Sequence, residues 1–391
     1  MESGVCHTFV IRSFRYCNMM CRPLQPEYKQ SNNKYMKNLT SCHPRTLFLA
    51  ALLLVSAVLP SFAQQEDDGA KKYLPHIHGT IRSKYEYQTG EGEGRFEVRN
   101  ARVSVDGNVT PRVSYKAEID LSDEGQIKML DAYTRLKWLE TGQFTIGQMR
   151  VPFTIDAHRS PHQQYFANRS FIAKQVGNVR DVGAVVGYTA NVGFPIILEG
   201  GLFNGSGLTN QKNFWTKNIN FSAKAQMFFP RGFNLTLSVQ KIKPEHVGVM
   251  MYDAGAYWQS HGWHIEAEYL FKHYGRDAFH NVHAFDSFVS YDIPVRKGLL
   301  RCVTPLVRFD YMGDHSDGTA SETTDASGAK VSRLVVNDYQ RSRLTGGVTL
   351  SLKKPFVSDI RLNYEKYFYR DGAVAKPSEK DKVVIEFMTR F

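Results

Sequence analysis

The side chains that carry out chemistry in enzymes are present in this chain, but they form none of the familiar catalytic motifs. The sequence has no G-x-S-x-G turn, no H-E-x-x-H helix and no phosphate-binding P-loop. His76 and His78 share one face of a predicted strand, and His280 lies three residues before His283. Two histidines alone seldom complete a metal site. The sequence therefore predicts no covalent catalysis, no cofactor and no metal centre.

The segment 46–63, TLFLAALLLVSAVLPSFA, is typical of a secretory signal peptide. It is an apolar run that follows basic residues and is too short to span a bilayer. Small side chains at its end suit a signal peptidase, so we expect cleavage before Gln64 and exclude residues 1–63 from the fold. The start stays open between Met1 and Met36, because Met36 is followed by a lysine, as in an ordinary signal.

Removing this segment changes what the composition indicates. Of the five cysteines only Cys302 lies in the exported part, which therefore cannot form an internal disulfide. The formal net charge is +11 for the whole chain and roughly +6 for the exported part. Such a mild balance, without a block of basic residues, does not predict nucleic-acid binding. The exported part has no apolar stretch of helix-spanning length, which excludes a helical membrane protein.

The end of the chain alternates strictly between two kinds of side chain. One face is mostly apolar and the other is charged: Val383, Ile385, Phe387, Thr389 and Phe391 against Lys382, Glu386 and Arg390. This pattern predicts a strand with lipid on one side and water on the other. The terminal Phe391 also resembles the signal that outer-membrane barrels present to their assembly machinery. A buried closing strand of a soluble β-sandwich is the alternative.

The same two-residue alternation recurs about sixteen times between residue 76 and the C-terminus. Short turns and longer connections follow one another in turn, and the long ones are 151–179, 205–217, 274–284, 314–340 and 370–380. Outer-membrane barrels have short periplasmic turns, longer external loops and an even number of strands. The sequence therefore predicts an all-β fold, a transmembrane antiparallel β-barrel of about 16 strands, in residues 64–391.

Five segments between Phe96 and Tyr188 carry a family resemblance. They are FEVRNARVSVDGNV, YKAEIDL, MLDAYTRL, FTIGQMRVPF and RDVGAVVGY. In this order they resemble the phosphate-selective porin O and P family of outer-membrane porins. The resemblance implies a sixteen-stranded barrel, commonly a homotrimer, in the bacterial outer membrane. It also implies a third external loop that folds inward to narrow the channel, and inward Arg and Lys side chains that draw anions.

By position, the inward loop is Val151 to Val179, which is too long for a plain connector. The resemblance makes this loop the constriction. The basic residues in or beside it are Arg150, Arg159, Arg169, Lys174 and Arg180. Guanidinium groups suit phosphate oxygens, and a ring of them repels cations. The alternative is that these charges solvate an external loop or pair with Asp156 and Asp181.

The second strand departs from the family pattern. The family often has two adjacent basic residues before the Ala-Arg, whereas this chain has Arg99-Asn100-Ala101-Arg102, so one anion-binding charge is missing. Arg99 and Arg102 complete the predicted anion-binding set. Predicted inward acids are nearly as numerous as inward cations, and interleaved charge gives little net selectivity. A non-selective general porin therefore stays open.

The sequence thus predicts an outer-membrane porin for passive diffusion of small hydrophilic solutes, with a bias toward anions such as phosphate. Its partners would be outer-membrane lipid, the assembly machinery and small anionic solutes. A barrel enzyme and an exported adhesin also stay open. An enzyme would need a nucleophile and a base close together near the rim, and a soluble adhesin would lack a lipid-facing apolar band.

Overall fold

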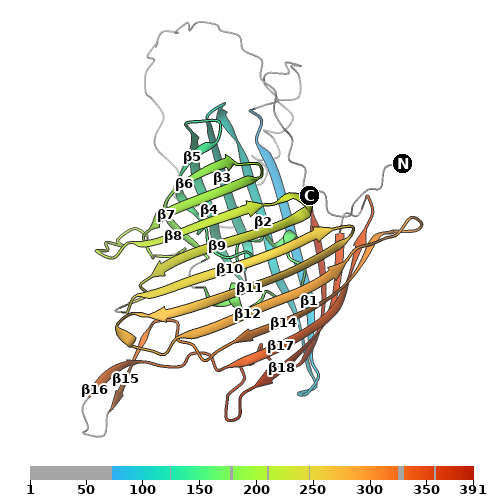
Figure 1. Ribbon diagram of the computed structural model, residues 1–391. Helices are drawn as coiled ribbons and strands as arrows, with labels where there is room; N and C mark the ends of the chain where they lie inside the picture. Colours follow the sequence, from blue (N-terminus) through green and yellow to red (C-terminus); the bar gives the residue numbers. More distant parts are fainter. Residues whose placement is uncertain are drawn as a thin grey trace, which may run out of the picture. The chain divides into compact units, whose positions relative to one another are not determined.

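Alternating apolar and polar side chains give one antiparallel sheet that closes on itself (Figure 1). This computed structural model describes residues 73–391 except 124, 177–178, 209–210, 246, 325–329 and 356–357. The predicted signal peptide, residues 1–63, lies outside the described residues. The sheet has 17 strands, of which the two-residue β13 (Ile293–Pro294) lies in a connection, so sixteen strands form the wall.

The wall strands follow one another around the barrel in chain order. Each pairs with the next, and β12 pairs directly with β14. They are β1 (His76–Gln88), β2 (Glu93–Thr110), β3 (Val113–Asp123), β4 (Gln126–Lys137), β5 (Gly142–Arg150), β6 (Arg180–Asn191), β7 (Pro195–Phe203), β8 (Asn220–Phe228), β9 (Phe233–Ile242), β10 (Val249–Ser260), β11 (Trp263–Tyr274), β12 (Val282–Tyr291), β14 (Leu300–Met312), β17 (Arg341–Leu352), β18 (Ser358–Tyr369) and β19 (Lys382–Arg390). The predicted barrel fold is confirmed.

The last strand closes the barrel against the first. β19 pairs with β1 from Lys382 opposite Gln88 to Arg390 opposite Thr80. Beyond the strand, the Gly79 N–H donates to the Phe391 carbonyl at 2.9 Å, and the Phe391 N–H donates back at 3.1 Å. The closing strand that the sequence predicts therefore pairs on both of its sides and leaves the sheet without a free edge.

The two faces of the wall differ as the alternation predicts. On β11, outward Ile265 is 47% exposed, whereas inward Glu266 and Glu268 are each 1% exposed. Outward apolar side chains of this kind occur all around the barrel and form its lipid-facing surface. Among the residues that the structure describes, no helix is long and apolar enough to cross a bilayer.

Connection lengths differ between the two ends of the barrel. Turns at one end are short, and the long connections at the other end are 151–179, 204–219, 313–340 and 370–381. The connection 313–340 carries the hairpin of β15 (Ala320–Thr324) and β16 (Lys330–Leu334). Two other connections contain a short helical turn: η2 (Pro230–Gly232) between β8 and β9, and η3 (Gly275–Asp277) between β11 and β12. The long end is external by the rule for outer-membrane barrels.

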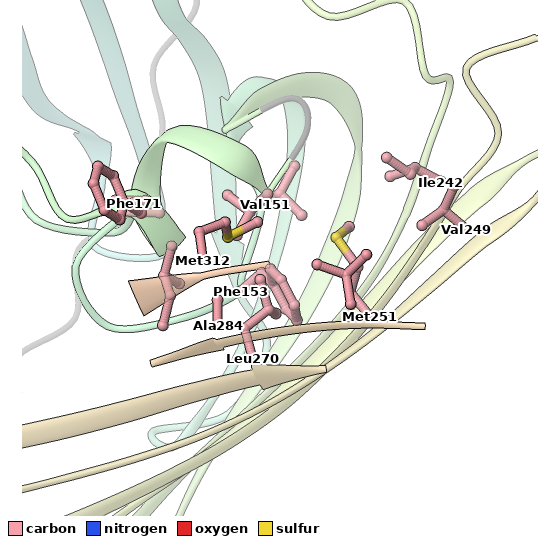
Figure 2. Packing of buried hydrophobic residues seen from close by; sticks show 14 of the residues in the cluster. Val151, Phe153, Phe171, Ile242, Val249, Met251, Leu270, Ala284 and Met312 are labelled. Carbon is pink, nitrogen blue, oxygen red and sulfur yellow. The ribbon is translucent and has the colours of Figure 1, made fainter. Parts of the chain in front are cut away.

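The connection 151–179, called loop 3 below, folds into the lumen. It contains the short helices η1 (Pro161–Gln163) and α3 (Phe171–Gln175). Most of its buried apolar side chains belong to one cluster with inward residues of β10 to β14, and Figure 2 shows Phe153 beside Leu270 and Ala284. Phe166 packs in a second cluster with Phe288 and Leu306. Burying a large apolar side chain completely contributes about 1.5–3 kcal/mol. Apolar packing therefore holds this part of the loop against the wall.

We expect the closure to be sensitive to a side chain at Gly79, because a Cβ there would lie 2.0 Å from the Phe391 ring. Gly79→Val should displace that ring, which is 69% exposed and can move aside, and lower the free energy of unfolding by about 0.5–1 kcal/mol. The measurement is urea unfolding in lipid vesicles, followed by gel mobility of unheated samples.

Gly346→Val is the matched control for this variant. Gly346 also faces outward, on β17, but a Cβ there meets nothing within 4 Å. This control should leave stability unchanged or raise it slightly, since valine favours strands. Equal losses in the two variants would contradict the role that we give to the Phe391 ring.

Candidate functional site

The first part of loop 3 is fixed to β8 and β9 by hydrogen bonds between its backbone and serine side chains of these strands. After Arg150 ends β5, Thr154 adopts a positive φ of 55° and turns the chain. The Ser222 hydroxyl donates to the Pro152 carbonyl at 2.7 Å, and the Thr154 N–H donates to the Ser238 hydroxyl at 3.1 Å. These short polar side chains face the lumen because they occupy the inward positions of their strands.

Two buried glutamates of β11 hold the next part of the loop. The Glu268 carboxylate accepts a hydrogen bond from the Ile155 N–H. The Glu266 carboxylate accepts hydrogen bonds from both terminal nitrogens of Arg159, and the Nη1–Oε1 distance is 2.7 Å. The Arg159 guanidinium also lies over the Tyr165 ring, 5.1 Å from its centroid. Burial disfavours the charged form, but the Glu266 carboxylate outweighs it and raises the pKa of Arg159. Arg159 is therefore a paired anchor of the loop.

Three arginines from β1, β14 and β17 bind three consecutive carbonyls of the loop. The bonds are Arg82 Nη2 to Ala167 O at 2.7 Å, Arg308 Nη1 to Asn168 O at 3.1 Å and Arg343 Nη2 to Arg169 O at 2.8 Å. β1 lies eight strands from β9, on the other side of the sixteen-stranded ring, and β14 and β17 lie four and five strands from β9. Loop 3 therefore crosses the lumen and is held at both sides.

The space left for water borders β2 to β4. Arg343, which meets the loop, is fully buried, whereas the side chains of Arg99 and Lys116 are 29% and 25% exposed. A solute passing loop 3 would therefore meet the inward charges of β2 to β4 on one side and the loop on the other.

Five of the seven predicted anion-binding residues have carboxylate partners. The distances are 3.6 Å from Arg99 to Asp123, 2.9 Å from Arg102 to Asp120, 3.3 Å from Lys174 to Glu379 and 2.7 Å from Arg180 to Asp131. The fifth pair is Arg159 with Glu266. A carboxylate within such a distance cancels much of the field that a passing anion would experience. Pairing therefore weakens the predicted anion site at these five positions.

Arg150 and Arg169 donate to backbone carbonyls instead. Arg150 Nη1 donates to the carbonyls of Ala157, His158 and Arg159 at 3.2, 3.1 and 2.9 Å. Its Nη2 is buried and has no hydrogen-bond partner among the described residues. Arg169 donates to the Asp156 carbonyl at 2.7 Å and the Arg159 carbonyl at 2.9 Å. Because carbonyls carry no net charge, Arg150 keeps its positive field.

These two arginines belong to a group of cations around His158. Burial lowers the pKa of the His158 imidazole well below its usual value, and four nearby cations lower it further: Lys224, Arg150, Arg180 and Arg169. We call these four residues the cationic cluster. The histidine itself is neutral at pH 7, so it adds a polar ring and no charge.

The predicted site is thus brought together only in part. Arg150, Arg169 and Arg180 meet at the cationic cluster, Arg102 contributes to the field on Arg169, and Arg99 pairs with acids of β2 and β3. Lys174 lies apart from the cluster, against Glu379 of the connection 370–381.

The pairing of β2 with β1 is irregular beside Arg99, where the register shifts. Asn100 then donates to Asp120 at 2.8 Å. Among the described residues no group of three His, Cys, Asp or Glu side chains could hold a metal.

Sequence reasoning missed His158 and the residues that receive loop 3. The inward positions of β10 and β11 are acidic in mid-strand, at Asp253 and Glu268, and apolar toward the external end, at Met251 and Leu270. Apolar inward positions are unusual in a water-filled barrel. That change along the strands was the available signal for a surface that a loop covers.

The fold and the inward loop define the class of protein: a closed antiparallel barrel, apolar outside and charged inside, narrowed by a loop, is a porin. Residues 76–274 match the family model described as Phosphate-selective porin O and P. The chain belongs to this family and is an outer-membrane porin, so the predicted family and location are confirmed.

Solved porin structures share the fold at low sequence identity. OmpT, an outer-membrane protein of Vibrio cholerae, is 12% identical with a TM-score of 0.55 and covers 81% of this chain and 99% of its own. The outer-membrane channel DcaP of Acinetobacter baumannii is 12% identical with a TM-score of 0.55, and the match covers 84% of this chain and 100% of DcaP. The anion-selective porin from Comamonas acidovorans is 11% identical with a TM-score of 0.54, and the match covers 82% of this chain and 100% of that porin. No curated protein matches the sequence.

We expect Arg159→Met to loosen loop 3, because it leaves the buried Glu266 without its cation. Removing one partner of a buried pair costs about 3–5 kcal/mol. Single-channel recordings in planar bilayers should show larger conductance and more open-channel noise. The double variant Arg159→Met/Glu266→Leu removes the uncompensated charge and should recover part of the wild-type behaviour.

Lys128→Met serves as the control for Arg159→Met. It breaks a partly exposed pair with Asp123, at 2.9 Å, which does not contact loop 3. It should therefore leave noise and conductance near the wild-type values. Wild-type conductance and noise in Arg159→Met would contradict the anchoring role of the pair.

We expect the ion selectivity to depend on pH through the charge of Lys174. Although its side chain is 33% exposed, desolvation by the surrounding protein lowers its pKa to about 8, against the opposing attraction of Glu379. Since this folded-state pKa lies below the ordinary value of 10.5, the folded protein loses the proton first as pH rises. The reversal potential in a KCl gradient should therefore shift toward cations between pH 7 and 9. In Lys174→Met this shift should shrink, and an unchanged shift would show that another group titrates.

Proposed function

We propose that this porin conducts small hydrophilic solutes passively and favours anions such as phosphate. The observation that carries the proposal is the position of Arg150 and Arg169 in the cationic cluster beside loop 3. Their guanidinium groups donate to backbone carbonyls, whereas the other two members, Arg180 and Lys224, have the carboxylate partners Asp131 at 2.7 Å and Glu199 at 3.7 Å. Within the cluster, Arg150 bonds only to carbonyls among its hydrogen-bond partners and keeps one nitrogen without a partner in the described part of the chain. The positive charge of Arg150 is therefore not cancelled by a carboxylate and can attract a passing anion through its field.

Transport would combine steric exclusion with weak electrostatic attraction. Loop 3 narrows the lumen, and guanidinium N–H groups replace part of the hydration shell of a passing anion. The same charges repel cations. Binding must stay weak, because an ion held tightly does not leave the channel. No covalent step is part of this mechanism.

The comparisons support the anion bias by analogy. The family is described as phosphate-selective, and the similar porin from Comamonas acidovorans is titled anion-selective. Since a shared fold does not transfer specificity, the argument for this chain rests on its own cluster.

A non-selective general porin is the second candidate, favoured by the pairing of charges. On β2 to β4 positive and negative side chains alternate, as in Lys116, which contacts Glu118 at 2.7 Å and Asp131 at 3.0 Å. Such interleaving gives a strong transverse field with little net sign. The two candidate functions predict different reversal potentials in a KCl gradient: an anion-favouring pore gives a potential of the anion's sign, and a non-selective pore gives one near zero.

We also propose how the chain matures and assembles. Residues 1–63 would be removed on export, leaving 64–391 as the barrel with loop 3 inside. Phe391, which is 69% exposed beside the closing strand, would be recognised by the assembly machinery. A homotrimer is proposed because OmpT of Vibrio cholerae is titled a trimer form.

Arg150→Gln tests the anion bias. A unit charge about 4 Å from a passing ion contributes about 1 kcal/mol in water, so the anion-to-cation permeability ratio should fall roughly fivefold. Reversal potentials in a KCl gradient measure this ratio, and added phosphate should reduce the chloride current of the wild type. Arg150→Lys keeps the charge and should preserve most of the ratio.

Arg135→Gln is the control for Arg150→Gln. This inward arginine bonds to the Thr145 hydroxyl at 3.1 Å and lies at the opposite end of the strands from loop 3. Arg135→Gln should therefore change the anion-to-cation permeability ratio less than Arg150→Gln does. A cation-selective wild type, or a ratio unaffected by Arg150→Gln, would favour the general porin.

A further inference from the structure

The lipid-facing wall of β6 to β10 contains a hollow of about 640 Å³. Most of its lining residues occupy outward positions of five successive strands, including Val186, Leu198, Gly200, Ala223 and Leu237. A volume of this size lies within the range of small-molecule pockets, ~300–1,000 Å³. The hollow therefore lies on the outside of the barrel, where the bilayer is its surroundings.

Small side chains create the hollow. Gly200, Ala223 and Ala225 form its floor on β7 and β8, and the larger Tyr188 and Tyr252 stand at its sides on β6 and β10. A Cβ added at Gly200 would meet nothing within 4 Å. The floor is therefore open to a long apolar chain, and a larger side chain could fill it without a clash.

Positive charge and an exposed aromatic residue lie at the external end of the same strands. The connection 204–219 joins β7 to β8 about 10 Å beyond Gly200 and Ala223, at ~3.3 Å per residue. It carries Trp215, which is 93% exposed, between the exposed Lys212 and Lys217. Tryptophan and lysine on such a connection suit the boundary between lipid and water.

A third lysine comes from β9. Lys241 lies two positions beyond Val239, a lining residue, and therefore on the same outward face, opposite Phe221 of β8. Within the described residues none of Lys212, Lys217 and Lys241 has an ion-pair partner. Lys243 Nζ donates to Asn218 at 3.2 Å, which ties the connection to the end of β9.

We propose that this face binds one phosphorylated lipid of the outer leaflet. Its acyl chain would fill the hollow, and its phosphates would contact Lys212, Lys217 and Lys241. A lipid satisfies both features with a single molecule, and the hollow is continuous with a wall that already faces the bilayer. The site is separate from the lumen, so it does not depend on the anion bias.

Two variants test the two halves of the site. Gly200→Leu fills the floor, and Gly346→Leu is its matched control, since Gly346 also faces outward with nothing within 4 Å of an added Cβ. The triple variant Lys212→Gln/Lys217→Gln/Lys241→Gln removes the charges. The probes are bisphosphorylated lipid A and the same lipid without its phosphates, added to the detergent-solubilised protein and followed by native mass spectrometry.

We expect the wild type and Gly346→Leu to retain one bisphosphorylated lipid per chain and to bind the dephosphorylated lipid at least tenfold more weakly. Each lysine near an anionic surface contributes about 1 kcal/mol, roughly fivefold, so the triple variant should lose at least tenfold in affinity. Gly200→Leu should lose a similar factor in affinity for the bisphosphorylated lipid. Conductance and reversal potential should stay at wild-type values in Gly200→Leu.

Two results would overturn the proposal. One is equal retention of the phosphorylated lipid by the wild type, Gly200→Leu and the triple variant. The other is loss of oligomers in Gly200→Leu but not in Gly346→Leu, which would assign the face to a second copy of the chain.

Discussion

An unpaired backbone N–H or C=O within a bilayer costs several kcal/mol, so the two edges of the sheet must meet. Here they meet between β1 and β19, where pairing runs from Gln88 to Thr80 and continues through Gly79 to Phe391. Once the ring is closed, the backbone is satisfied by the wall itself. Side chains are then free for other contacts, toward lipid on one face and toward the lumen on the other.

Inside the ring, much of the charge holds loop 3 in place. Arg82, Arg308 and Arg343 donate to consecutive loop carbonyls, and Glu266 and Glu268 bind the other side of the loop. Buried arginines are well suited to this role because one guanidinium can satisfy several acceptors. The same lumen therefore contains charges that fix the constriction and a smaller number that face a solute.

The wall separates its two roles by alternation along each strand. On β8, inward Ser222 contacts loop 3 and inward Lys224 belongs to the cationic cluster, while outward Ala223 and Ala225 form the floor of the lipid-side hollow. Adjacent residues thus face the lumen and the lipid in turn, since successive side chains of a strand point to opposite faces. A change in the lumen and a change at the lipid face can therefore be made independently.

The barrel could be predicted from the sequence, because each strand must show one side to lipid and the other to water, and this leaves a pattern that is local to the strand. Four of the five long connections could be predicted as well, whereas the predicted connection 274–284 is only 275–281 in the structure. Through a family resemblance, the connection that turns inward could also be predicted. Which charges stay unpaired became visible only in the folded chain. Arg159 and its partner Glu266 are 107 residues apart, and Arg180 reaches Asp131 49 residues away. Such pairs depend on strand register and on the path of loop 3 across the closed ring, and neither is written in the alternation of a single strand.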